Sequence, residues 1–473
     1  MKKSGRLFSN VLVLGIGSVI SKITVFFMLP LYTACLSPAA FGTVDILTNT
    51  AVLLLPFVSL CAPEAVFRFL AGGKGEREVL AVGNKLLIRG MILLLFILPV
   101  LSLFDILRPY IFYLFCYVMA SVIHSYLAHI LRARGQYGLY SVQQLFCTGV
   151  TVALAFLFLP VLNLGVRGYL MAIFLADIVT ALILSFYLRL DHEEKTSAEQ
   201  DTKLFRSMLR YAIPLIPTAT LWWALAVFDH YLLLAYHGES VTGLYAAAGK
   251  LPALLTFAAS IFLEAWHFAV IHEKEEKRGE LFGRIYSALL PVLILFVVTL
   301  IIGSRFLVER IFAADFGEAA LYVPLLSVAA LFSALSSFLG SVYVVKLRSG
   351  SSLITALVGA AVNMALDFWW IPSRGAVGAM AATLVSYVTI FIWRSVHCRR
   401  VMPFCQHAGK LTVSTLALLV SAVLTMMGHT LLSLAVAALA LAPFWHEIID
   451  SILILIVYGK KIFHISTKRE NRS

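Results

Sequence analysis

Long runs of apolar residues follow one another along most of the chain, and short polar segments separate them. A helix needs about 20 mainly apolar residues to cross the hydrocarbon core of a bilayer. Runs of this length predict fourteen membrane spans, near 10–35, 41–63, 84–104, 109–131, 140–162, 166–190, 211–236, 243–269, 285–305, 321–345, 353–372, 375–396, 411–428 and 430–458. The pattern therefore predicts an all-α polytopic membrane protein.

The two ends of this pattern are less regular than the rest. The first run follows the basic segment MKKSGR, as the apolar part of a signal peptide does, but it has no small-residue cleavage site. We therefore expect a retained first span. The last run is interrupted by polar residues and a proline, namely Pro443, His446, Glu447 and Asp450.

The composition and the distribution of basic residues agree with a membrane protein. Hydrophobic residues make up 61% of the 473 residues and charged residues only 13%, whereas about 25% is usual in soluble domains. If the N-terminus is cytosolic, five of the 37 lysines and arginines fall in predicted external segments, namely Arg108, Arg167, Arg305, Arg310 and Arg374. This asymmetry predicts cytosolic N- and C-termini. The net charge of +12 then faces anionic inner-leaflet lipids, and nucleic acid is not an expected partner.

The charged segment 191–210 separates two parts of the chain that resemble each other. A shift of 201 residues places Gly42 on Gly243, and a shift of 210 residues places the glycines of NLGVRG on those of SRGAVG. Repeats of this kind recur in transporters. We therefore predict four parts: an N-terminal six-helix bundle at 1–190, a cytosolic linker at 191–210, a C-terminal six-helix bundle at 211–400, and a terminal helix pair with a cytosolic tail at 401–473.

Three basic residues are candidate substrate contacts. Lys22 lies near the middle of the first predicted span, Arg68 lies at the inner end of the second, and Lys250 lies near the outer end of the eighth. Pro63 and Glu64, just before Arg68, suggest a helix break. An ionised lysine at a helix centre costs about 2.5–3.5 kcal/mol on insertion scales. Lys22 is therefore expected to face water, an anionic ligand or an acidic partner, and a purely structural ion pair is the alternative.

Acidic residues also occur within the predicted spans. The candidates for cavity or coupling residues are Asp45, Glu64, Asp177, Asp229 and Glu264, and Asp367 is a further acid of this kind. Asp229 precedes His230, and such a pair relays protons or binds a cation. A coupling ion, Na⁺ or H⁺, would act through one of these acids. The alternative for each acid is a hydrogen bond or ion pair within the helix bundle.

No catalytic or metal-binding motif is apparent. The chain has no P-loop, nucleophile elbow or H-E-x-x-H motif. The group His397, Cys398, Cys405 and His407 has no common zinc-ligand spacing. The short loops disfavour a membrane-embedded polymerase or acyltransferase, so we expect no enzyme activity, no metal site and no cofactor.

Several motifs resemble one known family. In the first two spans these are the span-one lysine, L-P-L-Y-T, L-S-x-x-x-F-G and S-L-x-x-P-E-A-x-x-R-F, and later segments are LRARGQYGLYSVQQ and NLGVRGYLMA. The chain resembles Wzx-like oligosaccharide flippases of the multidrug/oligosaccharidyl-lipid/polysaccharide exporter superfamily. The resemblance implies two six-helix bundles around a V-shaped central cavity, in the bacterial cytoplasmic membrane.

The resemblance also implies a function. Such flippases move undecaprenyl-pyrophosphate-linked oligosaccharides from the inner to the outer leaflet by alternating access, for cell-surface polysaccharide synthesis. It places Lys22 and Arg68 at the pyrophosphate, and Lys250 is added on its charge. Expected partners are the lipid-linked oligosaccharide, membrane lipids, and a polysaccharide polymerase or glycosyltransferases. The alternatives are a multidrug cation antiporter and a lipid II flippase.

Overall fold

The computed structural model describes residues 20, 23–24, 26–188, 198–272, 275–346, 349–402, 404, 407–445, 447–448 and 450. Half of the first predicted span, including Lys22, lies outside these residues, as does the end of the last. The described residues are helical and contain no strand. Contacts divide the chain into an N-terminal unit, Leu7–Val227, and a C-terminal unit that runs from Phe228 onward.

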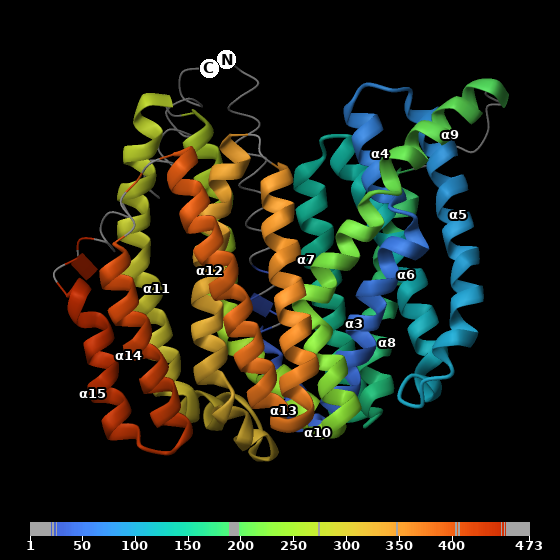
Figure 1. The fold of residues 1–473 in the computed structure, drawn as a ribbon. Coiled ribbons are helices and arrows are strands. Elements are labelled where there is room, and N and C mark those ends of the chain that lie inside the picture. The colour runs from blue at the N-terminus through green and yellow to red at the C-terminus, as the bar shows by residue number, and fades with distance from the viewer. Residues whose placement is uncertain are drawn as a thin grey trace. The chain divides into compact units, whose positions relative to one another are not determined.

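The N-terminal unit is a bundle of antiparallel helices (Figure 1). Its helices are α2 (Leu29–Cys35), α3 (Pro38–Ser59), α4 (Ala62–Ala71), α5 (Glu76–Leu101), α6 (Ile111–Ala133), α7 (Tyr137–Phe156), α8 (Gly165–Leu188), α9 (Ala198–Ala212) and the first part of α10 (Leu215–His272). Helix α6 packs on α3, α4 and α8, and so lies at the centre of this unit.

The second predicted span is broken where the sequence suggests a break. The Ser37 hydroxyl caps the N-terminus of α3 by accepting a hydrogen bond from the Ala40 amide. Leu60 and Cys61 then adopt left-handed backbone angles, with φ of 48° each, and end α3. Pro63 lies in the first turn of α4, where its missing amide hydrogen is not needed. The predicted helix break near Pro63 is confirmed.

A glycine lets two helices of this unit approach closely. A Cβ atom on Gly90 of α5 would lie 2.2 Å from the Val58 carbonyl oxygen of α3. No other residue fits at that position without moving the backbone. The core around this contact is apolar and includes Leu54, Leu86 and Leu94.

Helix α9 lies within and just beyond the segment predicted as a linker. Its residues Met208 and Ala212 are fully buried in the core of the N-terminal unit, and the helix packs on α4 and α5. The Arg89 guanidinium lies 4.4 Å from the centre of the Phe205 ring, a cation–π contact. The charged residues of 191–210 therefore include one face of a packed amphipathic helix.

The C-terminal unit contains the rest of α10 and five further α-helices. These are α11 (Glu275–Ile311), α12 (Val323–Val345), α13 (Ser349–Val401), α14 (Ala408–Met426) and α15 (Thr430–Leu441). Helices α14 and α15, drawn in orange-red to red in Figure 1, lie side by side along α11. Buried serines join them, because the Ser421 hydroxyl hydrogen-bonds to that of Ser433 at 2.9 Å and Ser414 donates to the Ala440 carbonyl oxygen.

Helices α10 and α13 are each two helices that meet at a glycine. Gly238 has φ of 82° and ψ of 179°, and Gly375 has φ of 56° and ψ of −136°. These angles are accessible to glycine at little cost. Each predicted pair of spans, 211–236 with 243–269 and 353–372 with 375–396, is therefore joined with almost no loop.

An aromatic cluster forms the inner core of the C-terminal unit. Phe338 of α12 stacks on Trp266 with 5.5 Å between ring centres and lies 4.5 Å from Phe282. The Trp266 indole donates a hydrogen bond to the Ser341 hydroxyl at 3.1 Å. Phe404 lies 4.7 Å from Phe282 on the other side. These contacts join α10, α11 and α12.

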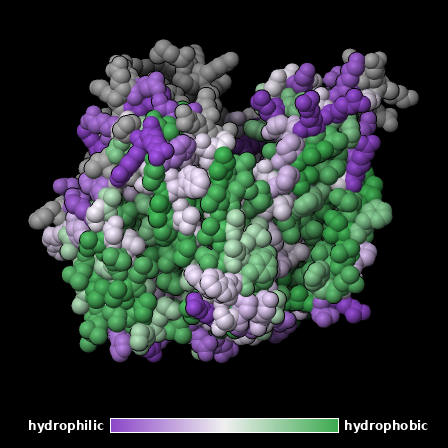
Figure 2. Space-filling view, in the orientation of Figure 1, coloured by the Kyte–Doolittle hydropathy of each residue, from purple (hydrophilic) through white to green (hydrophobic). Residues whose placement is uncertain are grey.

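Ten helices among the described residues are long and apolar enough to cross a membrane, and two of them are the double helices α10 and α13. Figure 2 shows hydrophobic side chains exposed along α14 and α15 and along α5, with hydrophilic side chains gathered near helix ends. Exposed leucines such as Leu431, 84% exposed, suit contact with lipid rather than water. The predicted all-α polytopic membrane fold is confirmed.

Candidate functional site

Asp229 of α10 is a buried acid with several hydrogen-bond donors around it. The Tyr245 hydroxyl donates to its Oδ2 at 2.6 Å, and Thr383 Oγ1 lies 3.5 Å from the same oxygen. The backbone amide of His230 donates to Oδ1 at 3.0 Å, and the His230 ring lies edge-on to the Tyr245 ring. Asp229 is thus held by groups from both legs of α10 and from α13.

Asp367 of α13 lies close enough to Asp229 for their charges to interact. It is fully buried, and neither of its carboxylate oxygens has a hydrogen-bond partner among the described residues. The side-chain nitrogen of Asn363, one turn earlier, also lacks a partner. An isolated buried carboxylate is unfavourable unless it is protonated or a cation neutralises it.

We call this set of oxygen-bearing residues the acidic group: Asp229, Tyr245, Asn363, Asp367 and Thr383. Carboxylate, amide and hydroxyl oxygens bind hard cations, and two adjacent carboxylates also share a proton readily. The arrangement can therefore take up a monovalent cation or a proton within the span region.

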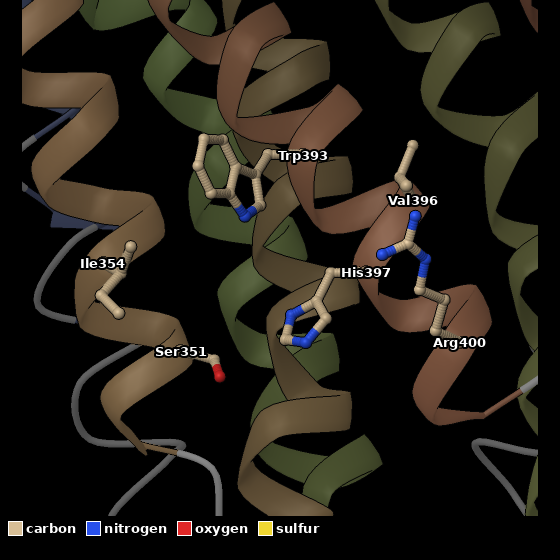
Figure 3. A pocket seen from close by; sticks show the side chains of 6 residues that line it. All are labelled: Ser351, Ile354, Trp393, Val396, His397 and Arg400. Carbon is tan, nitrogen blue, oxygen red and sulfur yellow. The ribbon is translucent and has the colours of Figure 1, made fainter.

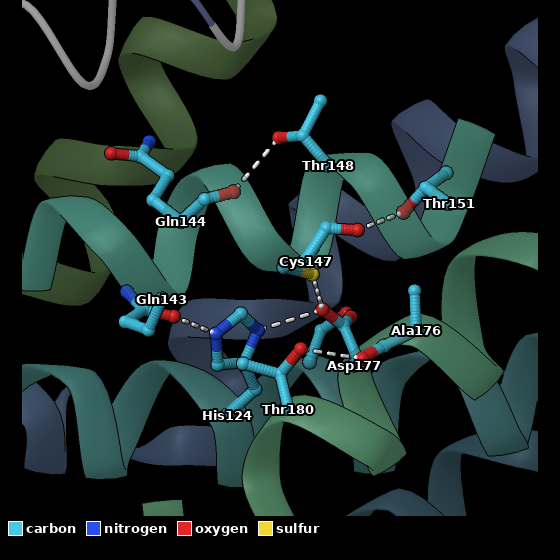
Figure 4. A network of polar contacts seen from close by, with 10 residues as sticks. His124, Gln143, Gln144, Cys147, Thr148, Thr151, Ala176, Asp177 and Thr180 are labelled. Atoms are coloured by element: carbon cyan, nitrogen blue, oxygen red, sulfur yellow. Dashed lines mark hydrogen bonds and ion pairs between the residues drawn. The ribbon is translucent and has the colours of Figure 1, made fainter. Parts of the chain in front are cut away.

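A second buried polar group lies in the N-terminal unit and is drawn in Figure 4. Asp177 of α8 accepts a hydrogen bond from Ser121 Oγ, and its Oδ1 lies 2.7 Å from His124 Nδ1 of α6. Cys147 Sγ of α7 lies 3.5 Å from the same Oδ1. His124 Nε2 lies 2.7 Å from Gln143 Oε1. One carboxylate thus connects three helices, α6, α7 and α8.

The other acids predicted in the N-terminal unit lie apart from this group. Asp45 of α3 is buried and accepts a hydrogen bond from Asn49 Nδ2 at 3.0 Å. Glu64 of α4 is exposed and lines a cavity of about 370 Å³. The cavity walls come from α3, α4, α6 and α10 and include Pro56, Ser125 and Trp222.

The predicted basic residues that the structure describes are exposed. Arg68 is exposed on α4, one turn after Glu64, and Lys250 is exposed on α10. Lys22 lies outside the described residues, and the side chain of Glu264 is also outside them. Their roles as substrate or cavity residues stay predictions.

A groove of about 450 Å³ lies between the two legs of α13 in the C-terminal unit. Figure 3 shows its lining, which is Ser351, Ile354, Trp393, Val396, His397 and Arg400. His397 Nδ1 lies 2.9 Å from the Tyr343 hydroxyl, which fixes the ring. The groove thus combines an aromatic ring, a guanidinium and an imidazole.

Arg394 lies near the end of the predicted span 375–396 and is buried. Its Nη1 donates to the Ser336 carbonyl oxygen at 2.8 Å and its Nε donates to Thr355 Oγ1 at 3.0 Å. A Cβ atom on Gly340 would lie 2.7 Å from this Nη1. Arg394 is therefore a structural cross-link between α12 and the two legs of α13.

Several residues of these groups did not emerge from the sequence. Tyr245, Asn363 and Thr383 are uncharged, and nothing in the local pattern marks them as neighbours of Asp229. His124 and Cys147 become candidates only through their contacts with Asp177. Asp177 lies 53 residues from His124 and 30 residues from Cys147 in the chain. An uncharged polar residue within a span is the weak signal that all of them share.

Comparison with solved structures shows the fold. The lipid II flippase MurJ in an inward closed conformation is similar with a TM-score of 0.69 and 13% identity, over 93% of this chain and 100% of that chain. A multidrug resistance MATE family transporter of the MOP superfamily is similar in its inward-facing conformation with a TM-score of 0.56 and 13% identity, over 80% and 94% of the two chains. Its outward-facing conformation gives a TM-score of 0.51 and 14% identity, over 83% and 96%.

Comparison by sequence identifies the family. A search of curated proteins found no match. The model of the polysaccharide biosynthesis protein family matches residues 7–267, which is more than half of the chain. That match includes the motifs of the first two spans and the polar group around Asp177. The chain therefore belongs to the polysaccharide biosynthesis protein family, and it has the fold of the MOP-superfamily transporters and of MurJ.

Proposed function

We propose that this protein moves an undecaprenyl-pyrophosphate-linked oligosaccharide from the inner to the outer leaflet of the bacterial cytoplasmic membrane by alternating access. The observation that carries the proposal is the family match over residues 7–267. The transporter fold and the exposed apolar helices support it. The oligosaccharide serves cell-surface polysaccharide synthesis, with glycosyltransferases before this step and a polymerase after it.

The chemistry of the substrate suits a protein without a catalytic centre. Moving a lipid between leaflets makes and breaks no covalent bond, whereas the pyrophosphate cannot cross the hydrocarbon core without a polar path. A lysine or arginine in that path supplies a charge-assisted partner for phosphate oxygens. We assign this role to Lys22, Arg68 and Lys250.

The acidic group supplies a place for the driving ion. In our proposal Na⁺ or H⁺ binds between Asp229 and Asp367 and favours one conformation of the C-terminal unit. The oxygens of Asp367 have no hydrogen-bond partner in the part of the chain that the structure describes, and they support this assignment because a cation would satisfy them. A ligand shifts a conformational equilibrium only by its differential affinity for the two states.

Leaflet transfer in proteoliposomes tests the proposal. The native chain, Lys22→Ala and the control Lys74→Ala, a lysine in the exposed turn after α4, are compared with an undecaprenyl-pyrophosphate oligosaccharide as substrate. Native and Lys74→Ala protein are expected to transfer it, and Lys22→Ala protein to transfer it at least about tenfold more slowly, which corresponds to about 1.4 kcal/mol. Equal transfer by all three would leave the flippase proposal intact and make Lys22 a structural residue.

Parallel assays separate the alternatives. The same vesicles are tested with lipid II and with an organic cation, under an imposed sodium or proton gradient. Transfer of lipid II alone would replace the proposal by a lipid II flippase. Uptake of the organic cation alone would replace it by a multidrug antiporter.

A further inference from the structure

The polar group around Asp177 has the composition of a metal site. His124 Nδ1, Cys147 Sγ and a carboxylate oxygen of Asp177 lie within 4.8 Å of one another. They come from α6, α7 and α8 and point toward one another in Figure 4. The side chains of His124 and Asp177 are 16% and 12% exposed, so the group is nearly enclosed but is not sealed from solvent.

The outer contacts hold these three residues in a ligating arrangement. Gln143 Oε1 lies 2.7 Å from His124 Nε2 and accepts its hydrogen, which leaves the Nδ1 lone pair directed at Asp177. Ser121 occupies the other carboxylate oxygen, Oδ2, and leaves Oδ1 facing His124 and Cys147. Metal-binding histidines and carboxylates are commonly oriented by such outer partners.

In the absence of metal, a proton must lie between His124 Nδ1 and Asp177 Oδ1, because both are acceptors in this tautomer. A divalent cation can take the place of that proton. It would bind the imidazole nitrogen, the carboxylate oxygen and the Cys147 thiolate, and release both the shared proton and the thiol proton to solvent.

The donor set selects the kind of metal. Mg²⁺ and Ca²⁺ prefer oxygen ligands, whereas one nitrogen, one sulfur and one oxygen suit Zn²⁺ and Co²⁺. Three protein ligands with an open fourth position are usual for an accessible zinc site. We propose that His124, Cys147 and Asp177 form a binding site for a thiophilic divalent cation of the zinc type, and that the bound ion joins α6, α7 and α8.

Cobalt spectroscopy of the purified, metal-free full chain tests this site. Co²⁺ is expected to give a thiolate-to-cobalt charge-transfer band in the near ultraviolet, and Zn²⁺ is expected to remove it. Cys147→Ser should abolish the band. The control is Cys116→Ser, which replaces a half-buried cysteine of α6 and should keep the band. Gln143→Ala should weaken cobalt binding about 10- to 100-fold, because it frees the His124 ring.

A second measurement needs no variant. In the native chain, Zn²⁺ is expected to slow the alkylation of Cys147 by a maleimide, as mapped by mass spectrometry, and Mg²⁺ is expected to leave it unchanged. The absence of a charge-transfer band in native protein would overturn the proposal, as would a band that survives Cys147→Ser or alkylation that Zn²⁺ does not slow. None of these readouts depends on transport.

Discussion

Tyr245 donates its hydroxyl hydrogen to Asp229 at 2.6 Å, although the two residues lie on opposite sides of the break at Gly238. The hydrogen bond therefore joins the two legs of α10 within a buried region. It also occupies Oδ2 of Asp229, whereas no donor to Asp367 is found within the described ranges. The two acids therefore differ in their hydrogen bonds, and substitution of Asp367 tests the role of the acidic group most directly.

Asp367→Asn is expected to stabilise the protein and to abolish ion-driven transport. The variant cannot ionise, so it avoids a buried carboxylate that has no hydrogen-bond partner among the described residues. Removal of one such buried carboxylate is expected to raise the free energy of unfolding by about 1–3 kcal/mol. Thermal unfolding in sodium-free detergent and gradient-driven transport in vesicles measure the two effects.

The matched control is Asp315→Asn, an exposed acid in the 3₁₀ segment Ala314–Leu321. It should change neither quantity. A destabilised Asp367→Asn variant with normal transport would show that the acidic group has only a structural role.

Gly90→Ala is expected to destabilise the N-terminal unit. The new methyl group would meet the Val58 carbonyl oxygen at 2.2 Å, and backbone atoms cannot yield as a side chain can. Overpacking of this kind costs about 1–3 kcal/mol. Gly149→Ala in α7 is the control, because a Cβ atom there meets nothing within 4 Å, and it should stabilise its helix by about 0.5–1 kcal/mol.

The two variants are compared by melting temperature in one detergent. Equal melting temperatures would show that α3 and α5 are not in close contact at Gly90.

Gly238→Ala is expected to cost about 1–3 kcal/mol, because φ of 82° with ψ of 179° is a conformation that essentially only glycine adopts. Gly249→Ala lies in the same helix, has open space around it and has no positive φ. It therefore separates backbone strain from any general effect of alanine. Thermal unfolding of both variants is the measurement, and a Gly238→Ala variant as stable as Gly249→Ala would argue against the break.

Arg394→Lys is expected to destabilise the C-terminal unit although it keeps the charge. A single ammonium group cannot reach both the Ser336 carbonyl oxygen and the Thr355 hydroxyl that the guanidinium now contacts. Loss of one charged hydrogen bond costs about 1.5–3 kcal/mol. Arg399→Lys, at an exposed position on the same helix, should have little effect on the melting temperature.

The ends of α11 and α12 are joined by an ion pair whose strength depends on pH. Lys346 Nζ lies 2.6 Å from Glu275 Oε1, and this hydrogen bond lowers the pKa of Glu275 below its ordinary value. A lowered pKa stabilises the folded state above the ordinary range of glutamate, and this contribution is lost as the pH falls through the folded-state pKa. Both groups are partly exposed, so the effect is small and salt-sensitive.

The comparison is between native protein and Glu275→Gln at low ionic strength. The difference between their melting temperatures should disappear in acid and in high salt. A difference that persists under both conditions would rule out the ion pair as its source.

The sequence was sufficient for much of the fold because lipid imposes strict requirements on a chain. Apolar runs of span length had to be helices, and Pro63 correctly indicated the break between α3 and α4. The single-glycine turns agree with the close spacing of predicted spans around Gly238 and Gly375.

The sites could be predicted only in part, because their contacts join different helices. Asp229 and Asp177 stood out as charges within spans, but their partners Tyr245 and His124 did not. The two ring nitrogens of His124 face Gln143 of α7 and Asp177 of α8, which lie on other helices. Periodicity within one helix contains no information about which face of another helix it will meet.

The breaks at Gly238 and Gly375 also determine which surface of the C-terminal unit is available for binding other molecules. The His237 ring lies 3.4 Å from where a Cβ atom of Gly375 would be, and its Nε2 lies 2.7 Å from the Ile371 carbonyl oxygen, so the two hairpin tips are locked together. The turns at Gly238 and Gly375 have no loop that a protease could cleave or an antibody could bind. In the flippase function that we propose, a polymerase that received the glycan from this unit would contact packed helix tips or the segment Phe312–Tyr322.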